Sequence, residues 1–358
     1  MQPTEQLRVC KVERKYTYDD LLLKPLYSTV ESRSHVSLQT TLGNVQLDIP
    51  IFASPMDRIT SYDMALEMAR LGGMGVVHRF MTIEEQVSIV TRLKEKKVKY
   101  IGAAIGSRDY ERFEALVKAG VSLTCIDIAN GWSIHMKDTV SYIEKHKRRK
   151  DITLMGGSIA TYDAAKDLFT WGVDVARCII GEGTMCLTRI NAGVGVPAMS
   201  TIKACRDAVR DFNSDLPDGR VRVGFIADGG IKQPGHCCLA LAAGANATML
   251  GSMLSATDES VGDVIMLDNV PHKCYRGCAS AEIQKDRGKS GDNVRVEGAS
   301  RLIPIKGPVK DIVQQICHGI QSCCSYMNAH NLRELRRNSV NRFIRVTPIG
   351  ASRNGVHI

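Results

Sequence analysis

The chain has 358 residues, of which 44% are hydrophobic and 24% charged, and this composition excludes a predominantly disordered protein. Lys and Arg exceed Asp and Glu by 9, a moderate basic excess that favours anionic partners without selecting among them. The twelve cysteines lack the spacing of a disulfide framework, the first thirty residues do not resemble a signal peptide, and no long apolar run occurs. We therefore expect a cytoplasmic protein with reduced cysteines and no membrane span.

Short apolar runs rich in β-branched residues recur along the chain and predict eight β-strands. They begin at Ile49, Gly73, Tyr100, Leu123, Ile152, Val173, Arg222 and Asn246. Amphipathic stretches with helical period lie between them, for example at 82–96, 110–119, 160–171 and 235–243. Hydrophobic strands that alternate with helices indicate a parallel sheet covered on both faces, and eight such units predict an α/β fold of the (β/α)8 TIM-barrel type. We expect one catalytic domain over residues 1–358.

An open nucleotide-binding sheet is the alternative, but it requires a G-x-G-x-x-G sequence directly after a strand. The G-x-G sequences at 181–183 and 193–195 do not continue in this way. Two connections after strands are unusually long, namely 181–201 after the sixth strand and 258–308 after the eighth. Because barrel enzymes carry their active sites on loops that follow strands, these two segments predict a catalytic loop and a flap.

Cys186 is the best candidate nucleophile. It lies in the first long loop, after Gly181 and Gly183 and before Arg189, in a flexible cationic setting that favours a thiolate. Thr188 stands close enough in sequence to donate and accept a proton. The alternative is that Cys186 is an inert small residue and that Thr188 only satisfies backbone groups.

Other polar groups follow the predicted strands directly. Asp228-Gly229-Gly230 ends the seventh strand and Gly251-Ser252 ends the eighth, where barrels commonly bind phosphate on backbone N–H groups. The pattern predicts a ribose bound by Asp228 beside a phosphate, with a helix N-cap and turn glycines as the alternative. Asp127 ends the fourth strand in the same manner. The basic runs at 145–150 and 333–337 lack interleaved aromatics, so we expect solvated helix ends and no nucleic-acid binding.

A series of ordered motifs resembles the IMP dehydrogenase and GMP reductase family. The motifs are S-P-M-D at 54–57, G-G at 156–157, G-E-G-T-M-C-L-T-R with G-V-G-V-P over 181–197, D-G-G at 228–230, G-S at 251–252, Y-R-G at 275–277 and E-G at 297–298. The resemblance implies a barrel, usually a homotetramer, that binds GMP or IMP and a nicotinamide cofactor without a Rossmann domain. Dehydrogenases of the family usually carry a pair of regulatory CBS domains before the third strand, but only 81–99 occupies that interval here.

The resemblance also implies roles for individual residues. Cys186 would attack purine C2 to form a thioimidate, with Thr188 and Glu297 transferring protons. The implied substrate-binding residues are Thr184, Asp228, Gly229, Gly230, Gly251, Ser252, Tyr275, Gly277, Cys278 and Ala279. The implied cofactor-binding residues are Arg79, Asp127, Ile128, Ala129, Ile180 and Gly181. A monovalent cation such as K⁺ would be bound by backbone carbonyls, with Gly181, Gly183, Cys186 and Arg189 as the implied set.

The chain departs from the family pattern at three points. Ser158 replaces the usual Asn after the G-G pair, Glu182 replaces a usual Pro or Ser in the cysteine loop, and Cys278-Ala279 replaces Met-Gly. Glu182 places a carboxylate near the expected phosphate and cation sites.

Two reactions share the thioimidate, and the flap favours one of them. Dehydrogenases oxidise IMP with NAD and then hydrolyse the thioimidate to XMP, using an Arg-Tyr pair in the flap to activate water. The segment between Ser280 and Glu297 is short and has no such pair, and residues 127–135 resemble the reductase version of their loop. Residues 54–57 and 71–75, in contrast, resemble the dehydrogenase sequences of the family more closely. We favour NADPH-dependent reduction of GMP to IMP, with IMP dehydrogenase and a non-catalytic purine- or RNA-binding barrel as alternatives.

Overall fold

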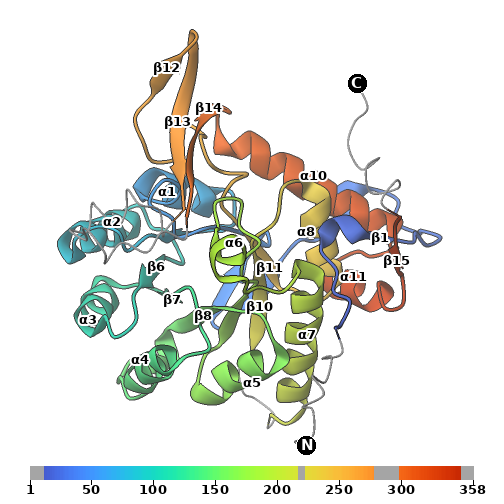
Figure 1. Ribbon diagram of the computed structural model, residues 1–358, viewed down its shortest axis with the longest axis horizontal. Helices are drawn as coiled ribbons and strands as arrows, with labels where there is room; N and C mark the ends of the chain where they lie inside the picture. The colour runs from blue at the N-terminus through green and yellow to red at the C-terminus, as the bar shows by residue number, and fades with distance from the viewer. Residues whose placement is uncertain (1–11, 217–221, 278–297, 348–358) are drawn as a thin grey trace, which may run out of the picture.

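Eight parallel strands form a closed barrel at the centre of the protein (Figure 1). The computed structural model describes residues 12–216, 222–277 and 298–347. The pairing follows chain order, and β11 closes the barrel by pairing with β4. The strands are β4 (Ile51–Ala53), β5 (Met74–Val77), β6 (Gly102–Ile105), β7 (Leu123–Asp127), β8 (Thr153–Ile159), β9 (Val175–Cys178), β10 (Gly224–Asp228) and β11 (Ala247–Leu250). The predicted (β/α)8 fold is therefore confirmed.

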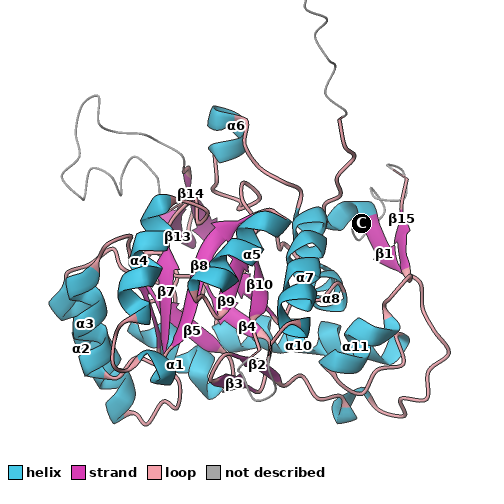
Figure 2. Ribbon diagram, turned by 90° about the horizontal axis from the view of Figure 1, so that it is seen from below, coloured by secondary structure: helices cyan, strands magenta, loops and turns pink. Residues whose placement is uncertain are grey.

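Helices surround this barrel, and Figure 2 shows them packed around the strands. They are α1 (Tyr62–Arg70), α2 (Ile83–Glu95), α3 (Tyr110–Ala119), α4 (Ile134–Glu144), α5 (Tyr162–Trp171), α7 (Ala198–Ser214), α8 (Pro234–Ala242), α10 (Val309–Tyr326) and α11 (Leu332–Asn338). The helices expected at 82–96, 110–119, 160–171 and 235–243 are all present. Helix α2 begins after Thr82, whose hydroxyl accepts a hydrogen bond from the Glu85 N–H in a capping box. Only α2 occupies the interval between β5 and β6.

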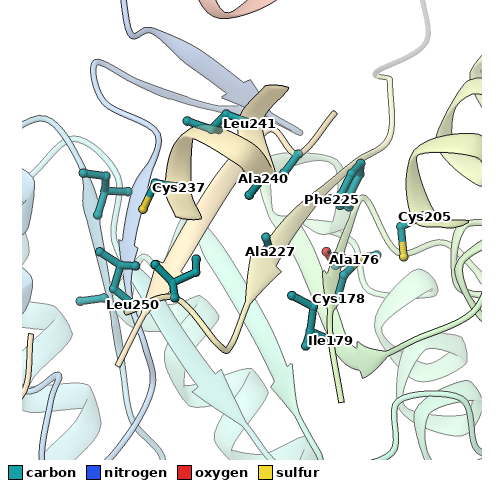
Figure 3. Close-up of a cluster of buried hydrophobic side chains, with 14 of the residues drawn as sticks. Ala176, Cys178, Ile179, Cys205, Phe225, Ala227, Cys237, Ala240, Leu241 and Leu250 are labelled. Carbon is teal, nitrogen blue, oxygen red and sulfur yellow. Dashed lines mark hydrogen bonds between the residues drawn. The ribbon is translucent and has the colours of Figure 1, made fainter. Parts of the chain in front are cut away.

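The apolar side chains form two layers, one inside the barrel and one between strands and helices. Because successive residues of a strand point to opposite faces, each strand supplies both layers. On β10, Ile226 belongs to the interior cluster, whereas Phe225 and Ala227 pack outward. Figure 3 shows part of the outer layer, which includes Phe225 and Ala227 of β10 and Ala240 of α8. The barrel interior is thus filled with side chains, and only the ends of the strands leave room for a polar site.

Smaller sheets flank the barrel. The hairpin of β2 (Thr40–Leu42) and β3 (Val45–Leu47) lies at its N-terminal end, where the Thr153 hydroxyl accepts a hydrogen bond from the Asn44 N–H. Strand β1 (Leu21–Leu23) pairs with β15 (Phe343–Arg345). Short 3-10 helices span Tyr18–Asp20, Arg33–His35 and Arg149–Asp151.

The flap region differs from expectation. The sequence predicts a flap at 258–308 and specifies no strands in it, but the described part of this segment forms an antiparallel sheet of β12 (Ile265–Leu267), β13 (Val270–Arg276) and β14 (Ser300–Pro304). This sheet stands away from the barrel in Figure 1. The pairing of β13 with β14 joins segments separated by more than twenty residues, so local periodicity did not reveal it. Within the part of the chain that the structure describes, no helix has the length and apolarity needed to cross a membrane.

Candidate active site

Three charged side chains meet inside the barrel at the C-terminal ends of β7, β9 and β10. Asp127, Arg177 and Asp228 each stand two residues after a member of the interior cluster, so the strand alternation points all three inward. Those preceding residues are Cys125, Val175 and Ile226. Arg177 is only 6% exposed and Asp127 only 9%. The barrel therefore holds a buried cation between two carboxylates, of which Asp127 is buried and Asp228 is only partly exposed.

Arg177 joins the two aspartates by short contacts. Its Nη1 donates to Asp127 Oδ1 at 2.8 Å, while Nε and Nη2 donate to Asp228 Oδ2 at 2.9 and 2.8 Å. Asp127 has a second cationic partner, because Arg79 Nε lies 3.3 Å from its Oδ2. Charge-assisted bonds of this kind are the strong ones in protein interiors. Both Arg177 contacts to Asp228 use the same oxygen, and Oδ1 accepts neither of them.

The surroundings shift the pKa values of the Asp127 and Asp228 carboxyl groups in opposite directions. Burial works against ionisation of Asp127, but Arg177 and Arg79 outweigh it and hold the pKa of Asp127 below its ordinary value. Burial raises the pKa of Asp228, and Arg177 offsets this only in part. Asp127 is therefore a stable anion.

Cys186 lies in the loop between β9 and α7, which also contains the short helix α6 (Thr188–Ala192). Its Sγ lies 3.3 Å from Thr188 Oγ1, so the proton donor or acceptor expected beside the thiol is in hydrogen-bond contact with it. The Ala299 N–H donates to the Met185 carbonyl at 3.0 Å, which docks the start of β14 on the loop. Among the ten cysteines that the structure describes, Cys186 alone lines the cavity at this end of the barrel.

That cavity has a volume of about 280 Å³ and brings the predicted chemistry and cofactor residues together. Cys186, Thr188, Asp228 and Gly229 all line it. The six residues expected at a cofactor all line it, namely Arg79, Asp127, Ile128, Ala129, Ile180 and Gly181. A lining that combines apolar side chains with the Arg79 guanidinium suits a flat ring attached to an anionic group, so this donor set fits a nicotinamide nucleotide.

A smaller pocket of about 60 Å³ adjoins the cavity and collects the predicted phosphate residues. Thr184 Oγ1 lies 3.2 Å from Ser252 Oγ, which brings the cysteine loop to the end of β11. Backbone angles φ of +126° at Gly229 and +74° at Gly230 turn the chain sharply after β10, a conformation that favours glycine. The pocket is lined by Thr184, Asp228, Gly229, Gly230, Gly251, Ser252 and Tyr275, among others.

The remaining predicted residues are not in this pocket. Gly277 does not line it, and its N–H donates to the Ala299 carbonyl at 2.9 Å beside the cysteine loop. Cys278, Ala279 and Glu297 lie outside the described residues.

Arg177 is a charged residue of the candidate site that the sequence did not point to. The sixth predicted strand, beginning at Val173, contains this single arginine in an otherwise apolar stretch from Val175 to Ile180. A charge at an inward position of a barrel strand is costly unless it is paired. The strand alternation together with that charge was the signal that could have identified it.

The cation site implied by the resemblance does not fit these residues well. The Arg189 guanidinium lies in the loop itself, with its Nη1 2.6 Å from Glu182 Oε1. The Gly183 carbonyl accepts the Cys186 N–H at 2.9 Å, and the Arg189 carbonyl accepts the Gly193 N–H at 3.2 Å. The loop thus contains a cation of its own.

The fold and the site define a (β/α)8 barrel with a cysteine at the cavity on the C-terminal side of its strands, and the comparisons with known proteins specify the family. A family model described as the IMP dehydrogenase / GMP reductase domain matches residues 15–357. The chain is 33% identical to an inosine-5'-monophosphate dehydrogenase of Cryptosporidium parvum, with 95% of this chain and 94% of the relative covered. It is 31% identical to GMP reductase 2 of Bos taurus, with 93% and 94% covered. A GMP reductase of Leishmania major is 28% identical, with 95% and 96% covered. The chain belongs to the IMP dehydrogenase / GMP reductase family.

Proposed function

We propose that the protein is a GMP reductase, which converts GMP to IMP and ammonia with NADPH as reductant. The observation that carries the proposal is Cys186 at the substrate cavity, 3.3 Å from the Thr188 hydroxyl. Family membership supports purine nucleotide chemistry with a nicotinamide cofactor. The choice between the two family reactions rests on the flap sequence.

In the proposed reaction the Cys186 thiolate adds to purine C2, and the C2–N bond to the exocyclic amino group breaks. The amino group leaves as ammonia after taking up a proton, for which Thr188 and Glu297 are the proposed relay. The thioimidate remains on Cys186. A bound NADPH would supply the hydride to C2, and breakage of the C–S bond would return the Cys186 thiolate. Thr184, Ser252 and the backbone N–H groups of Gly229 and Gly230 are proposed to bind the phosphate, and Asp228 the ribose hydroxyls.

The reductive direction is favoured because the thioimidate must wait for hydride without being hydrolysed. Hydrolysis requires a group that activates water, and the sequence between Ser280 and Glu297 contains no Arg-Tyr pair. A flap that activates water poorly protects the intermediate from diversion to XMP. IMP dehydrogenase stays the second candidate because residues 54–57 and 71–75 resemble that branch and because a dehydrogenase is among the relatives at 33% identity.

The test is to incubate the protein with GMP and NADPH, or with IMP and NAD, and to follow the nicotinamide absorbance. We expect GMP-dependent NADPH oxidation with one ammonia released per IMP formed, and little XMP from IMP. Cys186→Ala should abolish turnover while it retains nucleotide binding, because the phosphate and ribose contacts lie elsewhere. Steady XMP formation faster than GMP reduction would identify a dehydrogenase instead. Substantial activity of Cys186→Ala would reject the covalent mechanism for both.

A further inference from the structure

The cysteine loop contains one acidic and one basic residue, and they pair with each other. Between 179 and 201, Glu182 and Arg189 are the only charged residues. Glu182 Oε1 lies 2.6 Å from Arg189 Nη1, and the Glu182 side chain is only 13% exposed. Its other oxygen lies 3.5 Å from the Thr17 hydroxyl. The pair therefore connects the two sides of the loop that carries Cys186.

The Arg189 side chain also fills the space between the two ends of this loop. A Cβ added to Gly181 would lie 2.5 Å from Arg189 Cγ, and a Cβ added to Gly195 would lie 2.9 Å from the same atom. Both distances are shorter than carbon atoms tolerate, so the arginine stem packs directly on two glycine backbones. Any side chain at either position would displace it. Packing and charge thus act together to close residues 181–195 around Cys186.

A bound monovalent cation would serve the same purpose as this ion pair. A cation held by carbonyls of 181, 183 and 186 would draw the two sides of the loop together, as the Glu182 carboxylate does by binding Arg189. A Pro or Ser at 182, the residues usual in the family, has no charge and cannot pair with Arg189. Glu182 is therefore a substitution with a structural consequence at the reactive loop.

We propose that the Glu182–Arg189 ion pair positions the Cys186 loop and makes its conformation independent of a monovalent cation. Glu182 is a positioning residue, because it acts on Cys186 through the loop. The inference rests on the proposed function only in that Cys186 is taken to be the reactive group.

The reactivity of Cys186 itself provides a test that needs neither nucleotide nor cofactor. Iodoacetamide labelling is followed by mass spectrometry on the tryptic peptide 178–189, which contains Cys178 and Cys186. Cys178 is fully buried, and burial raises the pKa of its thiol, so it serves as an unreactive internal reference. The measured quantity is the ratio of Cys186 labelling rates in KCl and in tetramethylammonium chloride at equal ionic strength. A ratio cancels the direct effect of a changed charge on the thiol.

For the native protein we expect a ratio near one. Glu182→Gln and Glu182→Ser should give labelling rates that differ about fivefold between the two salts, the upper range for a single partly buried ion pair. Glu67→Gln removes the carboxylate of a distant surface pair with Arg70 and should behave like the native protein. Arg189→Lys keeps the positive charge, so its ratio of labelling rates should be nearer to one than that of Glu182→Gln.

A native ratio of five or more would overturn the inference, as would ratios near one for both Glu182 variants. An enzyme that labels independently of potassium but turns over neither GMP nor IMP would still support the role of the ion pair. That result would count only against the proposed reaction.

Discussion

The buried Arg177 yields the most demanding prediction. Arg177→Met keeps an unbranched apolar stem but removes three charge-assisted hydrogen bonds and leaves two carboxylates without their main partner. Breaking a buried pair in this way costs about 3 to 5 kcal/mol, chiefly because the remaining charge stays desolvated. Asp127 still has Arg79 at 3.3 Å in this variant. Most of the loss in the free energy of unfolding should therefore come from the unpaired Asp228 carboxylate.

The free energy of unfolding, measured by urea denaturation at pH 7.5, tests this value. Arg177→Met alone should lose about 3 to 5 kcal/mol. The double variant Arg177→Met, Asp228→Asn should recover at least about 1 kcal/mol, because it removes the unpaired charge. Arg70→Met is the matched control, since it breaks an exposed pair with Glu67 and should cost less than about 1 kcal/mol.

Two results would refute the reasoning. One is a loss below about 1 kcal/mol for Arg177→Met, which would mean that the carboxylates are solvated or protonated without it. The other is a double variant no more stable than the single one. Either result would show that the ion pairs with Asp127 and Asp228 do not explain why an arginine lies inside the barrel.

The remaining predictions concern binding, acid stability and thiol reactivity. Asp228→Asn should weaken GMP binding by about 1.5 to 3 kcal/mol in calorimetry, whereas a GMP analogue without ribose hydroxyls should bind both proteins equally. Burial lowers the pKa of His78 from 6.5 to about 4, so below pH 6.5 the unfolded state takes up a proton that the folded state does not. The contribution of His78 to the free energy of unfolding therefore falls with decreasing pH, by about 3 kcal/mol at pH 4. In urea titrations, acid should destabilise His78→Gln by that much less than it destabilises the native protein. Burial raises the pKa of Cys125 to about 11, so iodoacetamide at pH 8 should leave it unlabelled; rapid labelling at that pH would contradict its burial.

The order of strands and helices could be predicted from the sequence because each depends on local pattern. Apolar β-branched runs separated by amphipathic stretches define a parallel (β/α)8 barrel, and each of the eight predicted strands overlaps an observed one. The sheet of β12, β13 and β14 was missed because its pairing depends on contacts between distant segments. The candidate site was anticipated as residue types at strand ends, since the C-terminal ends of barrel strands face one cavity.

What the sequence alone determined was the barrel, the end of it where the candidate site lies, and the loop that carries Cys186. Only the tertiary structure decided which charges meet there. Arg177 comes within 2.8 Å of Asp127 and Asp228, each about fifty residues away in the chain, because all three side chains point into the same barrel interior. Strand β10 pairs with β9, and the guanidinium reaches past β8 to the end of β7. The partner of Glu182 was likewise decided by a loop that folds back on itself, so that Arg189 packs on Gly181 and Gly195. Side-chain pairing depends on distances in space, and local sequence patterns do not contain them.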